Sequence, residues 1–174
     1  MRTPPKIIKV LAGTIAVLLA LQAGAIAANR RNGGPVTALR TASEAGTVHT
    51  EVVNRYRMVD GMSVTMRVPD GQQAHFVITF SAASHCSDQS GTRSAYCFVE
   101  VSVDGAPASP GQVVFDSAPD GTEAVVAWET NSMQFVSGPH GPGTHGVKVK
   151  YRVDEAGSSF SLDTRTLTVM RSRV

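Results

Sequence analysis

The sequence lacks the short motifs that mark most enzyme and cofactor sites. It contains no G-x-S-x-G nucleophile elbow, no S-x-x-K, no C-x-x-C pair and no P-loop. No pair of carboxylates stands out for glycoside hydrolysis, because aspartate and glutamate mostly occupy expected turns and strand surfaces. The sequence therefore predicts no catalytic residue and no cofactor, and it favours a protein that is not an enzyme.

The first segment carries an export signal. It opens with "MRTPPKIIKV", continues with an apolar run over Val10–Leu21 and ends in the small residues Ala25-Ile26-Ala27. This order is typical of a secretory signal peptide, so we expect residues 1–27 to form an N-terminal signal helix that is cleaved before Ala28. Retention as a membrane anchor is the alternative, although the apolar run is short for a span of about 20 residues.

An excess of positive charge is missing once this leader is set aside. The chain has 16 Lys and Arg against 14 Asp and Glu, and three of the bases lie in the leader, which leaves 13 against 14 and a net charge of −1. A nucleic-acid-binding protein needs a basic surface on its mature chain. The balance therefore argues against nucleic acid as a partner.

Helical patterns are also missing after the leader, and alternation takes their place. Residues 28–48 show no sustained apolar face and are predicted to form a flexible tether with at most a brief helical turn. From about Thr50 onward, apolar residues recur at every second position, as in half-buried strands. The clearest examples are "MSVTMRV" from Met62, "HFVITFS" from His75, "CFVEVSV" from Cys97 and "GVKVKYRV" from Gly146.

Turn signals separate these segments. Asp-Gly, which is favoured in tight hairpin turns, occurs at residues 60–61, 70–71, 104–105 and 120–121. No D-x-D-x-D-G loop with a closing glutamate accompanies them, so they predict turns and not calcium sites. In the last segment the apolar residues change parity, which predicts a bulge or break near Asp163-Thr164.

About nine short strands without helical crossovers predict an all-β fold, an antiparallel β-sandwich of the Ig-like or jelly-roll type, formed as a single domain by residues 49–174. The stretch "PGTHGVKVKYRVD" at residues 142–154 resembles exported bacterial β-sandwich modules of the Ig-like or jelly-roll kind. In these modules a Pro-Gly turn leads into an alternating strand near the C-terminus. The resemblance implies the fold class and no functional residue.

Cysteine is scarce, with Cys86 and Cys97 as the only two. In an exported protein two cysteines favour a disulfide, and the polar residues between them are predicted to form a loop that joins two neighbouring strands. Such a disulfide would contribute about 2–3 kcal/mol of stability. Free thiols and a metal-binding or catalytic thiolate are the alternatives, although thiolate zinc sites usually need four ligands, often supplied as close cysteine pairs.

Histidine offers another candidate for chemistry. His140 and His145 lie five residues apart in a Gly/Pro-rich turn, and the fold could bring His85 close to them as a metal site. Exposed or turn-capping histidines are the simpler interpretation, because no acidic ligand lies between the two and the spacing is not that of a helical pair. The sequence therefore favours no metal, and it predicts a surface position for His75.

Ligand-binding residues are sought among aromatic and basic side chains. Trp128, the only tryptophan, and Tyr96 could stack on sugar rings, although a core position is favoured for Trp128. Lys148, Lys150 and Arg152 share one strand face and could meet an anionic polymer, although a solvated face or a protected edge strand is favoured.

Together these features predict a secreted, non-catalytic binding or interaction module, extracellular or associated with the cell surface. Its expected partner is a protein or a glycan at the cell envelope, with no membrane contact after cleavage of the leader. Binding is expected at loop tips formed by residues 84–97, 129–132 and 138–146. The alternatives are a carbohydrate-binding module and a small metal-dependent hydrolase.

Overall fold

The computed structural model describes residues 35–88, 94–118 and 127–174, and these residues form strands and no helix. They belong to one compact unit, Pro35–Val174. No described segment is a helix long and apolar enough to cross a membrane. The predicted signal peptide and its cleavage site lie outside the described residues, so both stay predictions.

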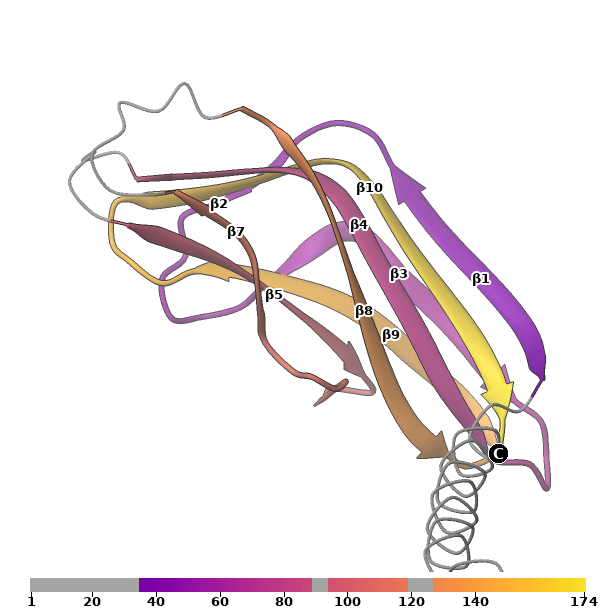
Figure 1. Cartoon of the computed structure of the whole chain (residues 1–174). Helices are drawn as coiled ribbons and strands as arrows, with labels where there is room; N and C mark the ends of the chain where they lie inside the picture. The colour runs from indigo at the N-terminus through magenta and orange to yellow at the C-terminus, as the bar shows by residue number, and fades with distance from the viewer. Residues whose placement is uncertain (1–34, 89–93, 119–126) are drawn as a thin grey trace, which may run out of the picture. The chain divides into compact units, whose positions relative to one another are not determined.

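Two antiparallel sheets make up the sandwich (Figure 1). Sheet A has the order β1-β10-β4-β8, with β2 also paired to β10. Its strands are β1 (Val36–Glu44), β2 (Val48–Thr50), β4 (Ala74–Asp88), β8 (Glu129–His140) and β10 (Ser158–Arg173). Sheet B has the order β3-β9-β5-β6, with β7 also paired to β5. Its strands are β3 (Arg57–Val68), β5 (Ala95–Val103), β6 (Ala106–Pro107), β7 (Val113–Ala118) and β9 (Gly143–Val153). The predicted β-sandwich is confirmed.

Strand alternation builds the core between the sheets. In β4, the residues at even positions from Ala74 to Cys86 are buried and those between them are half-buried. The apolar parity predicted for each of the four clearest segments is the buried one, and Phe76, Ile78 and Tyr151 are among the largest fully buried side chains. Burial of such side chains contributes about 1.5–3 kcal/mol each relative to exposure. The alternation therefore fixes which face of each strand points inward.

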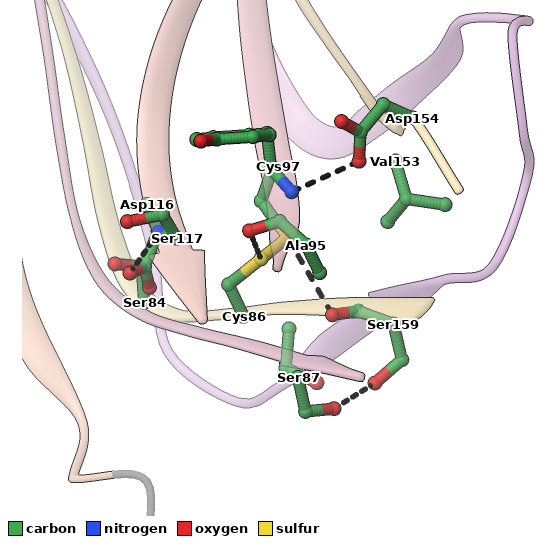
Figure 2. Close-up of a disulfide and its surroundings, with 12 residues drawn as sticks. Ser84, Cys86, Ser87, Ala95, Cys97, Asp116, Ser117, Val153, Asp154 and Ser159 are labelled. Carbon is green, nitrogen blue, oxygen red and sulfur yellow. Dashed lines mark hydrogen bonds between the residues drawn. A yellow bond between two sulfur atoms is a disulfide. The ribbon is translucent and has the colours of Figure 1, made fainter. Parts of the chain in front are cut away.

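The disulfide between Cys86 and Cys97 is confirmed, and it joins the two sheets. Cys86 lies in β4 of sheet A and Cys97 in β5 of sheet B, and both are fully buried (Figure 2). The two strands are consecutive in the chain but are not neighbours in one sheet, so that part of the prediction is corrected. Of the predicted loop, residues 84–88 continue β4 and residues 95–97 begin β5, whereas residues 89–93 lie outside the described part.

The flexible tether predicted over residues 28–48 is corrected from Val36 onward, because Val36–Glu44 forms β1 and pairs with β10. The strand is mostly exposed and packs only small side chains, Ala38 and Ala42, against the core, which explains its weak apolar signal. The turn after it is also held: the Asp163 carboxylate accepts hydrogen bonds from the Gly46 amide and the Thr47 hydroxyl, each at 3.1 Å.

Asp163 belongs to the predicted irregularity in the last strand. The β4–β10 register shifts between Asp163 and Thr166, and Thr164 has a φ of 42°. Phe160 and Leu162 before the shift and Leu167 after it are fully buried. The bulge is therefore confirmed, and it keeps apolar side chains inward on both sides.

The Asp-Gly pairs divide between turns and a bulge. Asp104 and Gly105 both have positive φ, 51° and 89°, and they turn the chain between β5 and β6 as predicted. Gly61 instead lies within β3, where the β3–β9 register shifts between Met58 and Ser63. The pair at residues 120–121 lies outside the described residues.

Both ends of the compact unit meet. β1 and β10 run antiparallel with Val36 opposite Ser172, and the Arg173 amide donates to the carbonyl oxygen of Pro35 at 3.4 Å. The Val174 amide donates to the carbonyl oxygen of Gln73 at 3.1 Å, immediately before β4. The first and last residues of the unit therefore lie at the end of sheet A where β4 begins (Figure 1).

Candidate functional site

The predicted ligand-binding loops lie at two opposite ends of the sandwich. The β4–β8 register pairs Ser84 with Glu129 at one end and Ala74 with His140 at the other. Residues 84–88 and 129–132 therefore lie together, whereas residues 138–146 lie at the far end. Because β-strands rise about 3.3 Å per residue, His85 and His75 on β4 are roughly 33 Å apart. A metal site that combines His85 with His140 and His145 is consequently ruled out.

Trp128 lies beside His85 at the first of these ends. It directly precedes β8, and its indole ring centroid is 5.6 Å from that of the His85 imidazole. Trp128 is 47% exposed, so the favoured core position is wrong. The reason is topological: β8 is an edge strand of sheet A, and the residue before it is left uncovered.

Tyr96 does not join Trp128 in one aromatic surface. It lies on β5 of sheet B and is 45% exposed, and its amide donates to the Asp154 carboxylate at 2.9 Å. Strand alternation turns Tyr96 outward from sheet B, because the next residue, Cys97, points inward to the disulfide. His85 faces outward from sheet A by the same argument. The two aromatic residues therefore belong to opposite faces of the sandwich.

Part of the outer face of sheet A is lined by short polar side chains, whereas the neighbouring row of Leu39, Met170, Val77 and Val136 is apolar. Strand register aligns two rows across β1, β10, β4 and β8, which we call the hydroxyl face: Ser43, Thr166, Ser81 and Ser132, then Thr41, Thr168, Thr79 and Gln134. Within the first row the Ser81 and Ser132 hydroxyls are 2.8 Å apart, and those of Ser43 and Thr166 are 3.3 Å apart. None of the eight residues is charged, so this face offers hydrogen bonds without a net charge.

The basic stripe on β9 is neither an edge nor a free cationic surface. β9 lies between β3 and β5, so the protected-edge interpretation is wrong. Lys150 Nζ lies 2.7 Å from Glu100 Oε1, with the two side chains only 18% and 11% exposed. The Arg152 guanidinium stacks 4.4 Å from the Phe98 ring centroid. Of the three predicted cations only Lys148 stays exposed, and the charge of Lys150 is balanced by Glu100.

A second basic feature was missed by sequence reasoning. A groove of about 570 Å³ runs along β1 and β3 and is lined by Arg40, Arg67 and Arg171 with polar and apolar neighbours. Arg171 holds the groove together, because its guanidinium donates to the Thr37 hydroxyl at 2.9 Å and to the carbonyl oxygen of Arg67. Arg40 and Arg67 are exposed. The three arginines come from three strands, and no local sequence signal brings them together.

Asp104, His140 and His145 converge at the opposite end of the sandwich from Trp128. One potential ligand atom from each lies within 4.8 Å of the others. His140 ends β8, His145 lies near the start of β9, and Asp104 follows β5. The histidine ring centroids are 4.9 Å apart, and the buried Phe76 ring stacks on His140 at 4.8 Å. We call these three residues the His–Asp cluster.

Asp104 and His145 form an ion pair. His145 Nδ1 lies 2.7 Å from Asp104 Oδ2, and His145 Nε2 lies 2.9 Å from the carbonyl oxygen of Gly141. A carbonyl oxygen and a carboxylate are both acceptors, so both ring nitrogens donate and the ring is an imidazolium. Burial alone lowers the pKa of His145, but the hydrogen bonds to Asp104 and Gly141, with the charge of Asp104, outweigh it and raise the pKa. The hydrogen bonds from His145 and from the Gly146 amide lower the pKa of Asp104.

His140 has the opposite protonation preference. Burial, followed by the positive charge of His145, lowers its pKa, so the ring is held neutral. Its Nε2 shares a hydrogen bond of 2.9 Å with the Ser137 hydroxyl. His75 was predicted at the surface, but it is half-buried near this cluster. It packs closely against Gly138, because a Cβ atom at that glycine would lie only 2.7 Å from His75 Nδ1.

Asp104 was predicted only as a turn former. Its place beside His145 follows from the β5–β9 register, which pairs Val103 with Val147. The segment Gly141–Gly146 has the glycine spacing G-x-G-x-x-G, but it leads into strand β9 and not into a helix, so it is no dinucleotide-binding turn.

No family model matches the chain, and no curated protein matches it. Among solved structures it is similar to dimeric latent PorU from Porphyromonas gingivalis, with a TM-score of 0.39 and 12% identity over 82% of this chain and 14% of that one. It is also similar to the CBM36-1 domain of a multidomain xylanase from the hindgut metagenome of Trinervitermes trinervoides, with a TM-score of 0.36 and 11% identity over 76% and 96%. A carbohydrate-binding module CBM36 in complex with calcium and xylotriose gives a TM-score of 0.33 and 13% identity over 78% and 99%. At these identities no functional residue carries over to this chain.

Proposed function

We propose that this protein is a non-catalytic binding module whose ligand is a neutral glycan, bound on the outer side of sheet A. The observation that carries the proposal is Trp128, which is 47% exposed beside His85 at the end of the sheet that carries the hydroxyl face. A partly exposed indole combines a large apolar ring with a polar N–H, so it can pack on the apolar side of a sugar ring. A signal peptide would place such a module at the cell envelope.

The hydroxyl face supplies the second half of the proposed site. Ligand sites combine apolar or aromatic contact with a few polar groups that fix orientation. Along β4, Ser81 lies four residues from His85, roughly 13 Å at the rise of a β-strand. An extended chain of sugar units that stacks on Trp128 would reach the hydroxyl rows, where short hydroxyl side chains can exchange hydrogen bonds with sugar hydroxyls.

Charge favours a neutral ligand over an anionic one. The hydroxyl face has no charged member. On the opposite sheet, Lys150 is neutralised by Glu100 and Arg152 is stacked on Phe98. An anionic polymer would instead be drawn to the arginine-lined groove between β1 and β3. The two ligand classes are therefore expected at different places, and one experiment separates them.

The test compares Trp128→Ala with Tyr96→Ala, a matched control of nearly equal exposure on the other sheet. The mature protein, from Ala28 onward, is run in affinity gels containing neutral xylan, neutral β-glucan or anionic polygalacturonate. We expect a neutral polymer to retard the wild type and Tyr96→Ala. Trp128→Ala should lose about tenfold in affinity, which corresponds to about 1.4 kcal/mol.

Two outcomes would contradict the proposal. Equal affinity of wild type and Trp128→Ala for every neutral polymer would show that the indole is not part of the site. Binding to polygalacturonate alone, abolished by Arg40→Ala with Arg67→Ala, would move the site to the groove. Trp128 is the only tryptophan, so a shift of wild-type fluorescence on addition of the polymer gives an independent readout.

A further inference from the structure

The His–Asp cluster has the donor set of a metal site. Its members are two imidazoles and one carboxylate, and their potential ligand atoms lie within 4.8 Å of one another. The other described histidines, His49, His75 and His85, are not members of this group. Imidazole and carboxylate together suit Zn²⁺ and similar first-row transition metals, whereas Ca²⁺ takes six to eight oxygen ligands.

Hydrogen bonds already orient two of the three ligands. Asp104 Oδ1 accepts from the Gly146 amide at 2.8 Å, which leaves Oδ2 turned toward His145. His145 Nε2 donates to the carbonyl oxygen of Gly141. This bond fixes the ring so that its other nitrogen, Nδ1, points at Asp104 Oδ2. Metal-bound histidines usually donate their second N–H to a carbonyl or carboxylate in this way, and that bond fixes the ring and its tautomer.

His140 is oriented by a similar pair of contacts. The Ser137 hydroxyl engages Nε2 at 2.9 Å, so the other ring nitrogen is left for a ligand. The buried Phe76 ring supports His140 in a stack with an interplanar angle of 14° and contacts His145 from the side at 5.7 Å. The buried Phe76 ring therefore limits the access of water to the cluster from the side of the core.

We propose that Asp104, His140 and His145 bind a divalent transition metal of the Zn²⁺ class, with three protein ligands and a fourth position open to water. Three protein ligands and one open position are a known arrangement for zinc. In a tetrahedral site with bonds of about 2.0–2.1 Å, ligand atoms lie about 3.3 Å apart. The longest separation in the cluster, up to 4.8 Å, therefore has to shorten by roughly 1–2 Å, whereas Asp104 Oδ2 and His145 Nδ1, now 2.7 Å apart, have to move apart by about 0.6 Å.

Metal binding at this place is an exchange with a proton. Without metal, the proton on His145 Nδ1 bridges the ring to Asp104 Oδ2, which are 2.7 Å apart. A metal ion bound by both atoms takes that position and releases the proton to solvent.

The experiment is a titration of Zn²⁺ into the mature protein, produced without a polyhistidine tag and followed by isothermal calorimetry. We expect one ion per chain for the wild type. Asp104→Asn, His140→Gln and His145→Gln should each weaken binding by at least about tenfold. Asparagine tolerates the positive φ of Asp104, so Asp104→Asn keeps the turn. His49→Ala and His85→Ala are the matched controls and should bind as the wild type does.

Cobalt supplies a readout of the ligands themselves. Co²⁺ in the wild type should give visible absorption bands of low coordination number that are lost in His145→Gln. Zn²⁺ binding that is no tighter in the wild type than in a variant carrying Asp104→Asn, His140→Gln and His145→Gln together would overturn the proposal, as would an equal loss in His49→Ala or His85→Ala. Circular dichroism checks that each variant is folded. Trp128→Ala should leave Zn²⁺ affinity unchanged, so this proposal and the glycan proposal fail or succeed separately.

Discussion

The disulfide between the sheets gives the most quantitative prediction. Cys86 and Cys97 are separated by 11 positions. In the chain-entropy model, closing a loop of about a dozen residues removes roughly 9–10 cal/mol/K from the unfolded chain, or about 2.8 kcal/mol at 25 °C. Replacing both residues by alanine also removes two buried sulfur atoms, which adds on the order of 1 kcal/mol. We expect a total loss of about 3–4 kcal/mol in the free energy of unfolding.

Equilibrium unfolding in guanidinium, followed by circular dichroism, measures this loss. For a domain of this size each kcal/mol lowers Tm by about 3–4 °C, so we expect a decrease of roughly 9–16 °C. The m-value should rise, because the unfolded chain without its cross-link exposes more surface. Val101→Ala is the matched control: it removes a buried side chain of sheet B without touching a cross-link, so stability should fall at constant m.

Two results would refute this reasoning. A loss below about 1 kcal/mol would show that the cross-link does not restrict the unfolded chain as the entropy model requires. An unchanged m-value with a large loss of stability would assign the effect to packing alone. The intact mass of the wild-type protein, about 2 Da below its reduced value, verifies that the bond is present before either comparison is made.

Two further predictions concern ion pairs. The Asp104–His145 pair should stabilise the protein within a pH window. The stabilisation from His145 is fully present below its ordinary pKa of 6.5 and is lost as the pH rises through its raised pKa. The stabilisation from Asp104 is fully present above its ordinary pKa of 3.8 and is lost as the pH falls through its lowered pKa. The stability difference between wild type and Asp104→Asn, measured by metal-free denaturation, should therefore peak near pH 5–6, and a flat difference from pH 4 to 9 would contradict the ion pair. Lys150→Met leaves the Glu100 carboxylate largely buried without its partner and should cost about 3 kcal/mol. Adding Glu100→Gln should recover part of that cost, and a neutral Lys150→Met would show that the pair contributes nothing.

Strand positions and their inward faces were predictable because they depend on local alternation. Val147, Val149 and Tyr151 alternate with charged residues in the sequence, and all three are buried. β1 was missed for the same physical reason, since its inward side chains are the small Ala38 and Ala42. Its order comes from pairing with β10, which is distant in sequence and invisible to a local pattern.

The candidate sites depend on register and strand order, which alternation does not encode. Asp104 meets His145 only because β5 pairs with β9. Trp128 precedes β8, the last strand of sheet A, and it is exposed there. The cysteines were the exception, because a chain with two of them leaves a single pairing.

The two ends of the compact unit, Pro35 and Val174, lie at the same end of sheet A. Pro35 and Arg173 lie beside each other where β4 begins, and Trp128 lies beside His85 toward the other end of β4. The distance along the strand is roughly 33 Å. Attachment through either end of this unit, to a surface or to a fused domain, would therefore leave Trp128 at the end of sheet A that is far from the attachment point. The compact unit, immobilised through either of its ends, should keep the proposed glycan site accessible.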